Sequence, residues 1–138
     1  MNSFQRFLKP FILIGLGLVI SQSGFAQNKK LPVAPHGGKL QAAQENYFIE
    51  FVFSRDSSLV YLLDKKLKPT NNAGITGEIS FEQPDSVITR SELKPAGPNC
   101  FVAKTTAEKY TAVFVRFDIK GTKISARFEE ISVVTGQK

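Results

Sequence analysis

The sequence predicts an all-β domain, built as an antiparallel β-sandwich of immunoglobulin-like architecture with seven or eight strands. Helical periodicity is absent after residue 27, and β-branched and aromatic residues recur there in short runs. Gly, Pro, Asn and Asp separate these runs at intervals of roughly ten residues, as is typical of sandwiches. A small β-barrel is the alternative arrangement of the same strands. Because the chain has no Trp and a single Cys, the prediction concerns architecture and not kinship with antibody domains.

Three strands are expected in the first part of the domain. Residues 38–43 form an edge strand, residues 47–53 a second strand, and residues 59–64 a third, which ends in a turn at residues 65–69. The period-two alternation of the second strand places Phe48, Glu50 and Val52 on the face opposite to Tyr47, Ile49, Phe51 and Phe53.

The middle of the domain carries one clear strand, one weaker strand and one short strand. Residues 75–82 alternate cleanly, which predicts one wet face and one buried face. A weaker strand is expected at residues 87–93, and another strand follows a loop at residues 100–104. The inward set of the clear strand is Ile75, Gly77, Ile79 and Phe81.

The strongest strand pair comes last. Residues 110–119 and 122–128 both alternate, and Lys120-Gly121 between them predicts a hairpin in which Gly121 supplies a positive φ. A separate edge segment is expected at residues 131–134. The inward residues of the pair are Val113, Val115, Phe117, Ile119, Ile124, Ala126 and Phe128.

The N-terminus has the order of a secretory signal peptide. Arg6 and Lys9 precede an apolar run at residues 11–20, and Gly24 and Ala26 fit a small-residue cleavage site. The apolar run is about half the length that a membrane-spanning helix needs, so an uncleaved anchor is the weaker alternative. The chain therefore divides into a signal peptide (1–26), an extended lead-in (27–35), the β domain (36–134) and a disordered tail (135–138), and we expect a periplasmic or secreted protein without a membrane span after cleavage.

Charge and cysteine content argue against a nucleic-acid-binding protein and against a domain stabilised by disulfides. The net charge is +6 without any long block of like charges, and nucleic-acid-binding motifs are absent. Cys100 is the sole cysteine and cannot form an internal disulfide. It is expected to be a buried, inert thiol in a strand, with a reactive or metal-binding thiol as the alternative.

Catalytic machinery is also missing from the sequence. The chain has one histidine, His36, which lies in a turn far from any serine or cysteine in an elbow-like setting. The adjacent carboxylates Glu129 and Glu130 are typical of solvated charge, and no Gly-rich loop links a strand to a helix. The sequence therefore predicts a protein that is not an enzyme.

His36 stands out because it lies within Ala34-Pro35-His36-Gly37-Gly38. Proline before it and two glycines after it predict an exposed turn that the backbone can approach closely, which suits a metal ligand. A metal site needs three or four donors, however, so an ordinary surface histidine is the alternative on composition alone.

A resemblance adds to this reading. The pattern of a His-Gly-Gly turn, a strand carrying a glutamate, a strand ending in Asp and a Lys-Pro turn resembles a small periplasmic β-domain. That domain occurs in or beside the periplasmic adaptor proteins of copper and cobalt-zinc-cadmium efflux systems. The similarity covers most of residues 35–118. The matching residues are His36, Gly37, Gly38, residues 47–50, residues 60–64, Lys68 and Pro69.

The resemblance implies a metal site formed by His36, Glu50 and Asp64, with Cys100 as a distant fourth ligand. Members of the family often carry a histidine where this chain has Phe48, and no methionine follows residue 26. One imidazole with carboxylates suits a weak zinc or copper(II) ion better than a tightly held one. The alternatives are that Glu50 is an outward charge paired with a lysine and that Asp64 caps the turn after its strand.

Two function hypotheses follow. The first is an exported, non-catalytic binding module linked to heavy-metal handling, which binds a copper or zinc ion weakly or docks on a periplasmic efflux component. The second is a structural or protein-interaction domain that has lost the metal, in which exposed Phe48 and Val52 form a contact surface.

Overall fold

The structure, a computed structural model, describes residues 30–132. The predicted signal peptide (1–26), the start of the lead-in, the end of the last predicted edge segment and the tail (135–138) lie outside the described residues. No described helix is long and apolar enough to cross a membrane. The described residues form eight strands and one short 3-10 turn, η1 (Gln44–Asn46): β1 (Lys39–Ala42), β2 (Phe48–Val52), β3 (Ser57–Leu63), β4 (Ile75–Glu82), β5 (Ile88–Pro95), β6 (Phe101–Lys104), β7 (Lys109–Ile119) and β8 (Thr122–Ser132).

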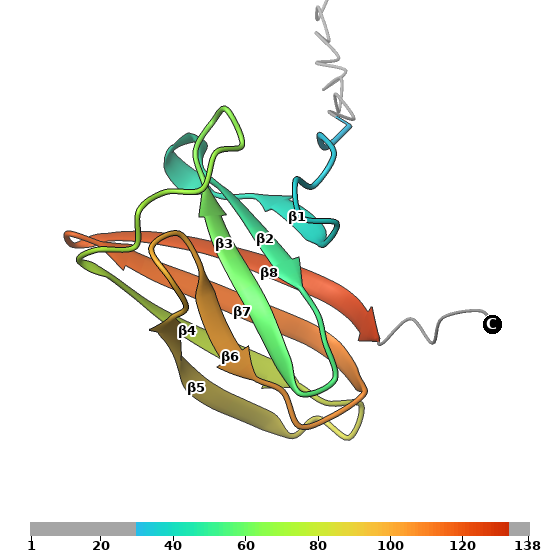
Figure 1. Cartoon of the computed structure of the whole chain (residues 1–138). Helices are drawn as coiled ribbons and strands as arrows, with labels where there is room; N and C mark the ends of the chain where they lie inside the picture. The colour runs from blue at the N-terminus through green and yellow to red at the C-terminus, as the bar shows by residue number, and fades with distance from the viewer. Residues whose placement is uncertain (1–29, 133–138) are drawn as a thin grey trace, which may run out of the picture.

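All eight strands belong to one antiparallel sheet in the order β1-β2-β3-β6-β5-β4-β7-β8. Figure 1 shows β1, β2, β3 and β6 as one layer in front of β4, β5, β7 and β8. The first and last strands of the order lie close together, because Lys39 Nζ on β1 donates hydrogen bonds to the carbonyls of Glu129 (2.9 Å) and Glu130 (3.1 Å) on β8. The all-β prediction is confirmed, and the single, nearly closed sheet corresponds to its small-barrel alternative.

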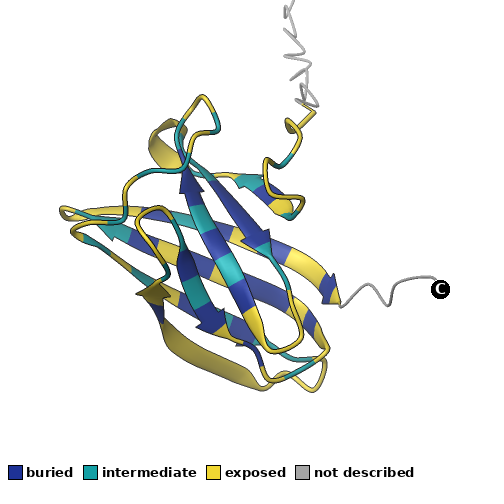
Figure 2. Ribbon diagram, viewed as in Figure 1, coloured by how far each residue is buried: buried dark blue, intermediate teal, exposed yellow. Residues whose placement is uncertain are grey.

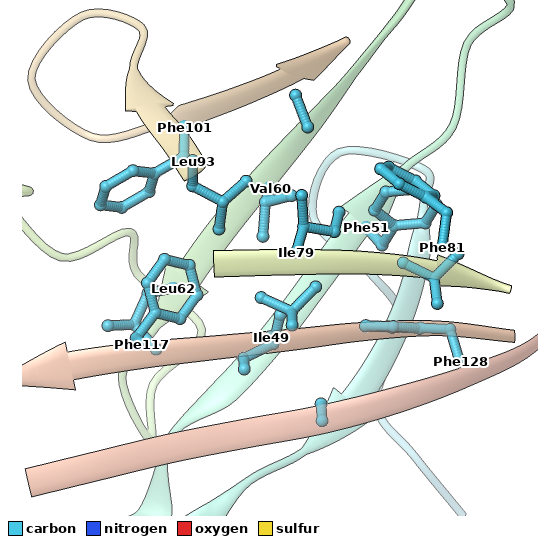
Figure 3. Close-up of a cluster of buried hydrophobic side chains, with 14 of the residues drawn as sticks. Ile49, Phe51, Val60, Leu62, Ile79, Phe81, Leu93, Phe101, Phe117 and Phe128 are labelled. Carbon is cyan, nitrogen blue, oxygen red and sulfur yellow. The ribbon is translucent and has the colours of Figure 1, made fainter. Parts of the chain in front are cut away.

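The core lies between the two layers, where inward side chains from both layers meet (Figure 3). Ile79, Val115 and Phe117, which the alternation places inward, are at most 1% exposed. Buried and exposed residues alternate along β7 and β8 in Figure 2. Burial of this apolar surface is the main stabilising contribution to the fold, because the described chain contains no disulfide.

The β7–β8 hairpin confirms the predicted turn. Lys120 (φ 50°) and Gly121 (φ 89°) both have positive φ, as a two-residue type I′ turn requires, and Asp118 accepts a hydrogen bond from the Gly121 N–H (2.8 Å). The prediction of a separate segment at residues 131–134 was wrong for its described part. β8 continues to Ser132. The backbone is distorted only at Glu130 (φ 52°), and Ile131 beyond it still pairs with Tyr110 in the register of the rest of the hairpin.

Candidate functional site

Glu50 is the most unusual residue of the sheet. It lies on the outward side of β2, between the inward side chains of Ile49 and Phe51, yet it is 0% exposed. The turn at residues 34–38 supplies its hydrogen-bond partners. Oε1 accepts the backbone N–H groups of His36 (2.8 Å) and Gly38 (3.0 Å), and Oε2 lies 2.8 Å from His36 Nδ1. A buried carboxylate needs such partners, since burial without them is costly.

The two glycines allow this turn for different reasons. Gly37 has φ +74°, a conformation that L side chains rarely adopt, and its N–H donates to the carbonyl of Ala34 (3.2 Å). Gly38 lies so close to β2 that an added Cβ would be 2.5 Å from the carbonyl oxygen of Phe51. The turn can therefore lie flat against β2, with two backbone N–H groups pointing at one carboxylate oxygen.

The imidazole of His36 is held on two sides. It stacks on the ring of Tyr61, with centroids 3.7 Å apart and planes 3° from parallel, and Tyr61 is the cross-strand partner of Glu50. Because the Glu50 carboxylate only accepts hydrogen bonds, the contact to Nδ1 requires the proton on Nδ1. Among the described residues Nε2 has no hydrogen-bond partner, and the side chain is 33% exposed.

Glu50 and Tyr61 begin a row of outward-facing residues that runs across β2 and β3 to Cys100, directly before β6. The β3–β6 register pairs Val60 with Phe101, which sets Tyr61 opposite Cys100. Burial is the main cause that raises the pKa of the half-buried Cys100 thiol, and the neighbouring Tyr61 hydroxyl opposes this only in part. Burial also raises the pKa of the Tyr61 phenol, with further contributions from Cys100 and Glu50. Both groups therefore keep their protons at neutral pH.

Asp64 does not join this row. It follows β3, and its Oδ1 accepts the backbone N–H groups of Lys66 (2.8 Å) and Lys68 (3.0 Å). These bonds, chiefly that from Lys68, lower the pKa of the Asp64 carboxyl. The geometry is that of a side chain capping its own turn, the alternative weighed for this residue.

The structure thus joins two of the three predicted ligands and separates the third. His36 and Glu50 are in contact, but within residues 30–132 no three His, Cys, Asp or Glu residues are grouped so that they could hold a metal ion. The alternative for Glu50 was wrong, because its partner is His36 and not a lysine. Phe48 and Val52 are half-buried rather than exposed.

Tyr61 is the site residue that sequence reasoning missed. Its signal was present, since antiparallel pairing of the second and third predicted strands sets one residue of the third strand beside Glu50. The register of that pairing is not readable from the sequence alone.

Comparison with known proteins gave no match: no family model, no curated protein and no solved structure aligns with the chain. Fold and site together define a small antiparallel β-barrel whose N-terminal histidine turn is fastened to the outer face by a buried carboxylate.

Proposed function

We propose that this protein is an exported, non-catalytic binding module that presents Nε2 of His36 to a copper(II) or zinc ion in heavy-metal handling. The observation that carries the proposal is the 2.8 Å contact between Glu50 Oε2 and His36 Nδ1. It fixes the tautomer in which Nε2 bears the lone pair, which is the form that ligates metals.

A carboxylate behind a histidine is a common arrangement around metal ions. The carboxylate orients the ring and increases the basicity of the ligating nitrogen. Here the stack on Tyr61 restricts the ring further. Glu50 is accordingly a positioning residue and not a ligand, because both of its oxygens are already hydrogen-bonded within the protein.

One imidazole holds an ion weakly, since zinc and copper(II) sites take several donors. In this proposal solvent or a second molecule, such as a periplasmic efflux component, supplies the remaining ligands. The side chain of Asp64 is committed to its turn, and within residues 30–132 no three His, Cys, Asp or Glu residues are grouped to hold an ion, so neither Asp64 nor Cys100 is included in the ligand set. The link to heavy-metal handling in this proposal comes from the sequence resemblance of the His-Gly-Gly turn to domains of efflux adaptors.

Calorimetric titration of the purified protein with Cu(II) and with Zn(II) tests the proposal. We expect weak binding that His36→Ala abolishes and that Glu50→Gln weakens by roughly 10- to 100-fold. Glu78→Gln, which changes a glutamate on the exposed outer face of β4, is the matched control and leaves binding unchanged. Circular dichroism verifies that each variant is folded.

Two results would contradict the proposal. Heat that persists unchanged in His36→Ala would remove this residue from the site, and no heat in the wild type would favour the interaction domain. Nitrogen-15 NMR gives an independent reading, because the chain has one histidine. A proton on Nε2 instead of Nδ1 would be incompatible with the Glu50 contact.

A further inference from the structure

β5 differs from every other strand of the sheet in its exposure. Leu93 is its one buried residue, and Ile88 is 56% exposed. β5 pairs with β4 through six residue pairs, but with β6 only at Lys94 and Pro95. Figure 2 accordingly shows β5 as almost entirely exposed. The edge of residues 88–93 that faces away from β4 therefore has no strand paired to it among the described residues, and its backbone groups are open to another strand.

The charges on this edge are unpaired within the described chain. Arg90 and Glu92 point outward, since they alternate with inward Leu93, and neither takes part in an ion pair among residues 30–132. The β4–β5 register sets Glu92 directly opposite Glu78 and sets Arg90 opposite Ser80. Like charges in directly opposed positions are destabilising, so Glu78 is an unfavourable neighbour of Glu92, and Glu92 makes no ion pair among residues 30–132 that would offset it.

We propose that the free edge of β5 pairs with the same edge of a second copy of this chain, antiparallel about a two-fold axis at Ser91. This register sets Arg90 opposite Glu92 of the partner subunit and Glu92 opposite the partner's Arg90. Directly opposed side chains of an antiparallel pair have their Cβ atoms about 5 Å apart, within reach of an ion pair. Each Glu92 then gains a cation on the side away from Glu78.

The other two-fold registers centred within residues 89–92 lack this complementarity. An axis at Arg90 opposes two arginines, an axis at Glu92 opposes two glutamates, and an axis at Thr89 sets Arg90 opposite Ile88 of the partner subunit. Charges on an edge strand commonly prevent such pairing, but these two charges attract in the one register centred between them. The ladder is confined to residues 89–93, because β6 already occupies this edge of β5 at Lys94 and Pro95. Such a short interface forms a weak, reversible dimer.

Sedimentation equilibrium of the purified protein, at concentrations up to roughly 1 mM, tests the pairing. We expect a concentration-dependent dimer in the wild type. Arg90→Glu and Glu92→Arg should each raise the dissociation constant by roughly tenfold or more, because attraction becomes repulsion at both symmetric contacts. The double variant R90E/E92R exchanges the two charges and should restore dimerisation to within roughly threefold of the wild type.

Lys109→Glu is the control, since it makes the same charge change as Arg90→Glu on an exposed residue of β7. It should leave the dissociation constant unchanged. The proposal is overturned by a wild type that stays monomeric over the whole range, by single variants that dimerise like the wild type, or by a double variant that remains monomeric. Circular dichroism shows that each variant keeps its strand content, so loss of dimer is separated from loss of fold.

Discussion

The two layers of this barrel have outer faces of opposite character, although the same period-two alternation runs through both. On β4 and β7 the outward residues, such as Glu78 and Arg116, meet water. On β2 and β3 the outward residues include buried Leu63 and buried Glu50. The difference lies in what covers each face. The turn at residues 34–38 supplies hydrogen bonds to Glu50, and Pro69 forms a bridge with Leu63. The alternation along a strand thus determines which way a side chain points, and the segment that covers that face determines how exposed the side chain is.

The strongest way to sharpen this comparison is to truncate two phenylalanines of the same strand. Phe117 points into the core and is 0% exposed, whereas Phe114 points outward and is 42% exposed. We expect Phe117→Ala to lower the free energy of unfolding by about 3–5 kcal/mol, through lost burial and the cavity left behind. Phe114→Ala should cost about 0.5–1 kcal/mol, because the ring mainly supports Arg127, whose guanidinium lies 4.6 Å from its centroid.

Urea unfolding of both variants measures the two free energies. The comparison fails if the two costs are equal, since that would mean that β7 does not divide its faces between core and solvent. The slope of unfolding free energy against urea should stay constant, which shows that the denatured state is unchanged.

A pair of glutamates tests the covered face directly. Glu50→Ala leaves two backbone N–H groups and one imidazole N–H without their acceptor, and we expect it to lower the free energy of unfolding by about 3 kcal/mol. Glu78→Ala, at an exposed outward position, should change it by less than about 0.5 kcal/mol. Thermal or urea unfolding gives both values. Equal small losses in the two variants would show that the turn does not depend on Glu50.

The strands whose outer face meets water, β4, β7 and β8, are also the part of the fold that the sequence predicts best. Where one face meets water and the other meets the core, polar and apolar residues alternate, and the inward sets of β4, β7 and β8 follow directly. β2 and β3 carry apolar residues on both sides, so alternation predicts their directions but not which outward residues are buried. The covering contacts come from residues 34–38, which have no periodic pattern.

Closure of the sheet is even harder to predict from the sequence than the burial of outward residues on β2 and β3. β5 and β6 are joined through two residue pairs, and β1 meets β8 through the hydrogen bonds of Lys39. Neither contact changes the hydrophobic pattern of a strand, which is why the sequence left sandwich and barrel as alternatives. The site shows the same limit: the proline and glycines of its turn pointed to His36 and the family resemblance pointed to Glu50, whereas the stack on Tyr61 depends on register.

The smallest expected effect concerns Asp64, which caps an exposed turn beyond the covered face. The N–H donors of Lys68 and Lys66 lower the pKa of its carboxyl in the folded protein, so ionised Asp64 favours the folded state. This contribution is fully present above the unfolded pKa, about 4, and is lost as the pH falls through the lower folded value. The unfolding free energy of the wild type should therefore fall more steeply with acid below about pH 4 than that of Asp64→Asn. Asp118, whose pKa is also lowered, is common to both proteins and cancels in the difference. A difference that stays constant from neutral pH to about pH 2 would mean that the cap does not depend on the charge of Asp64.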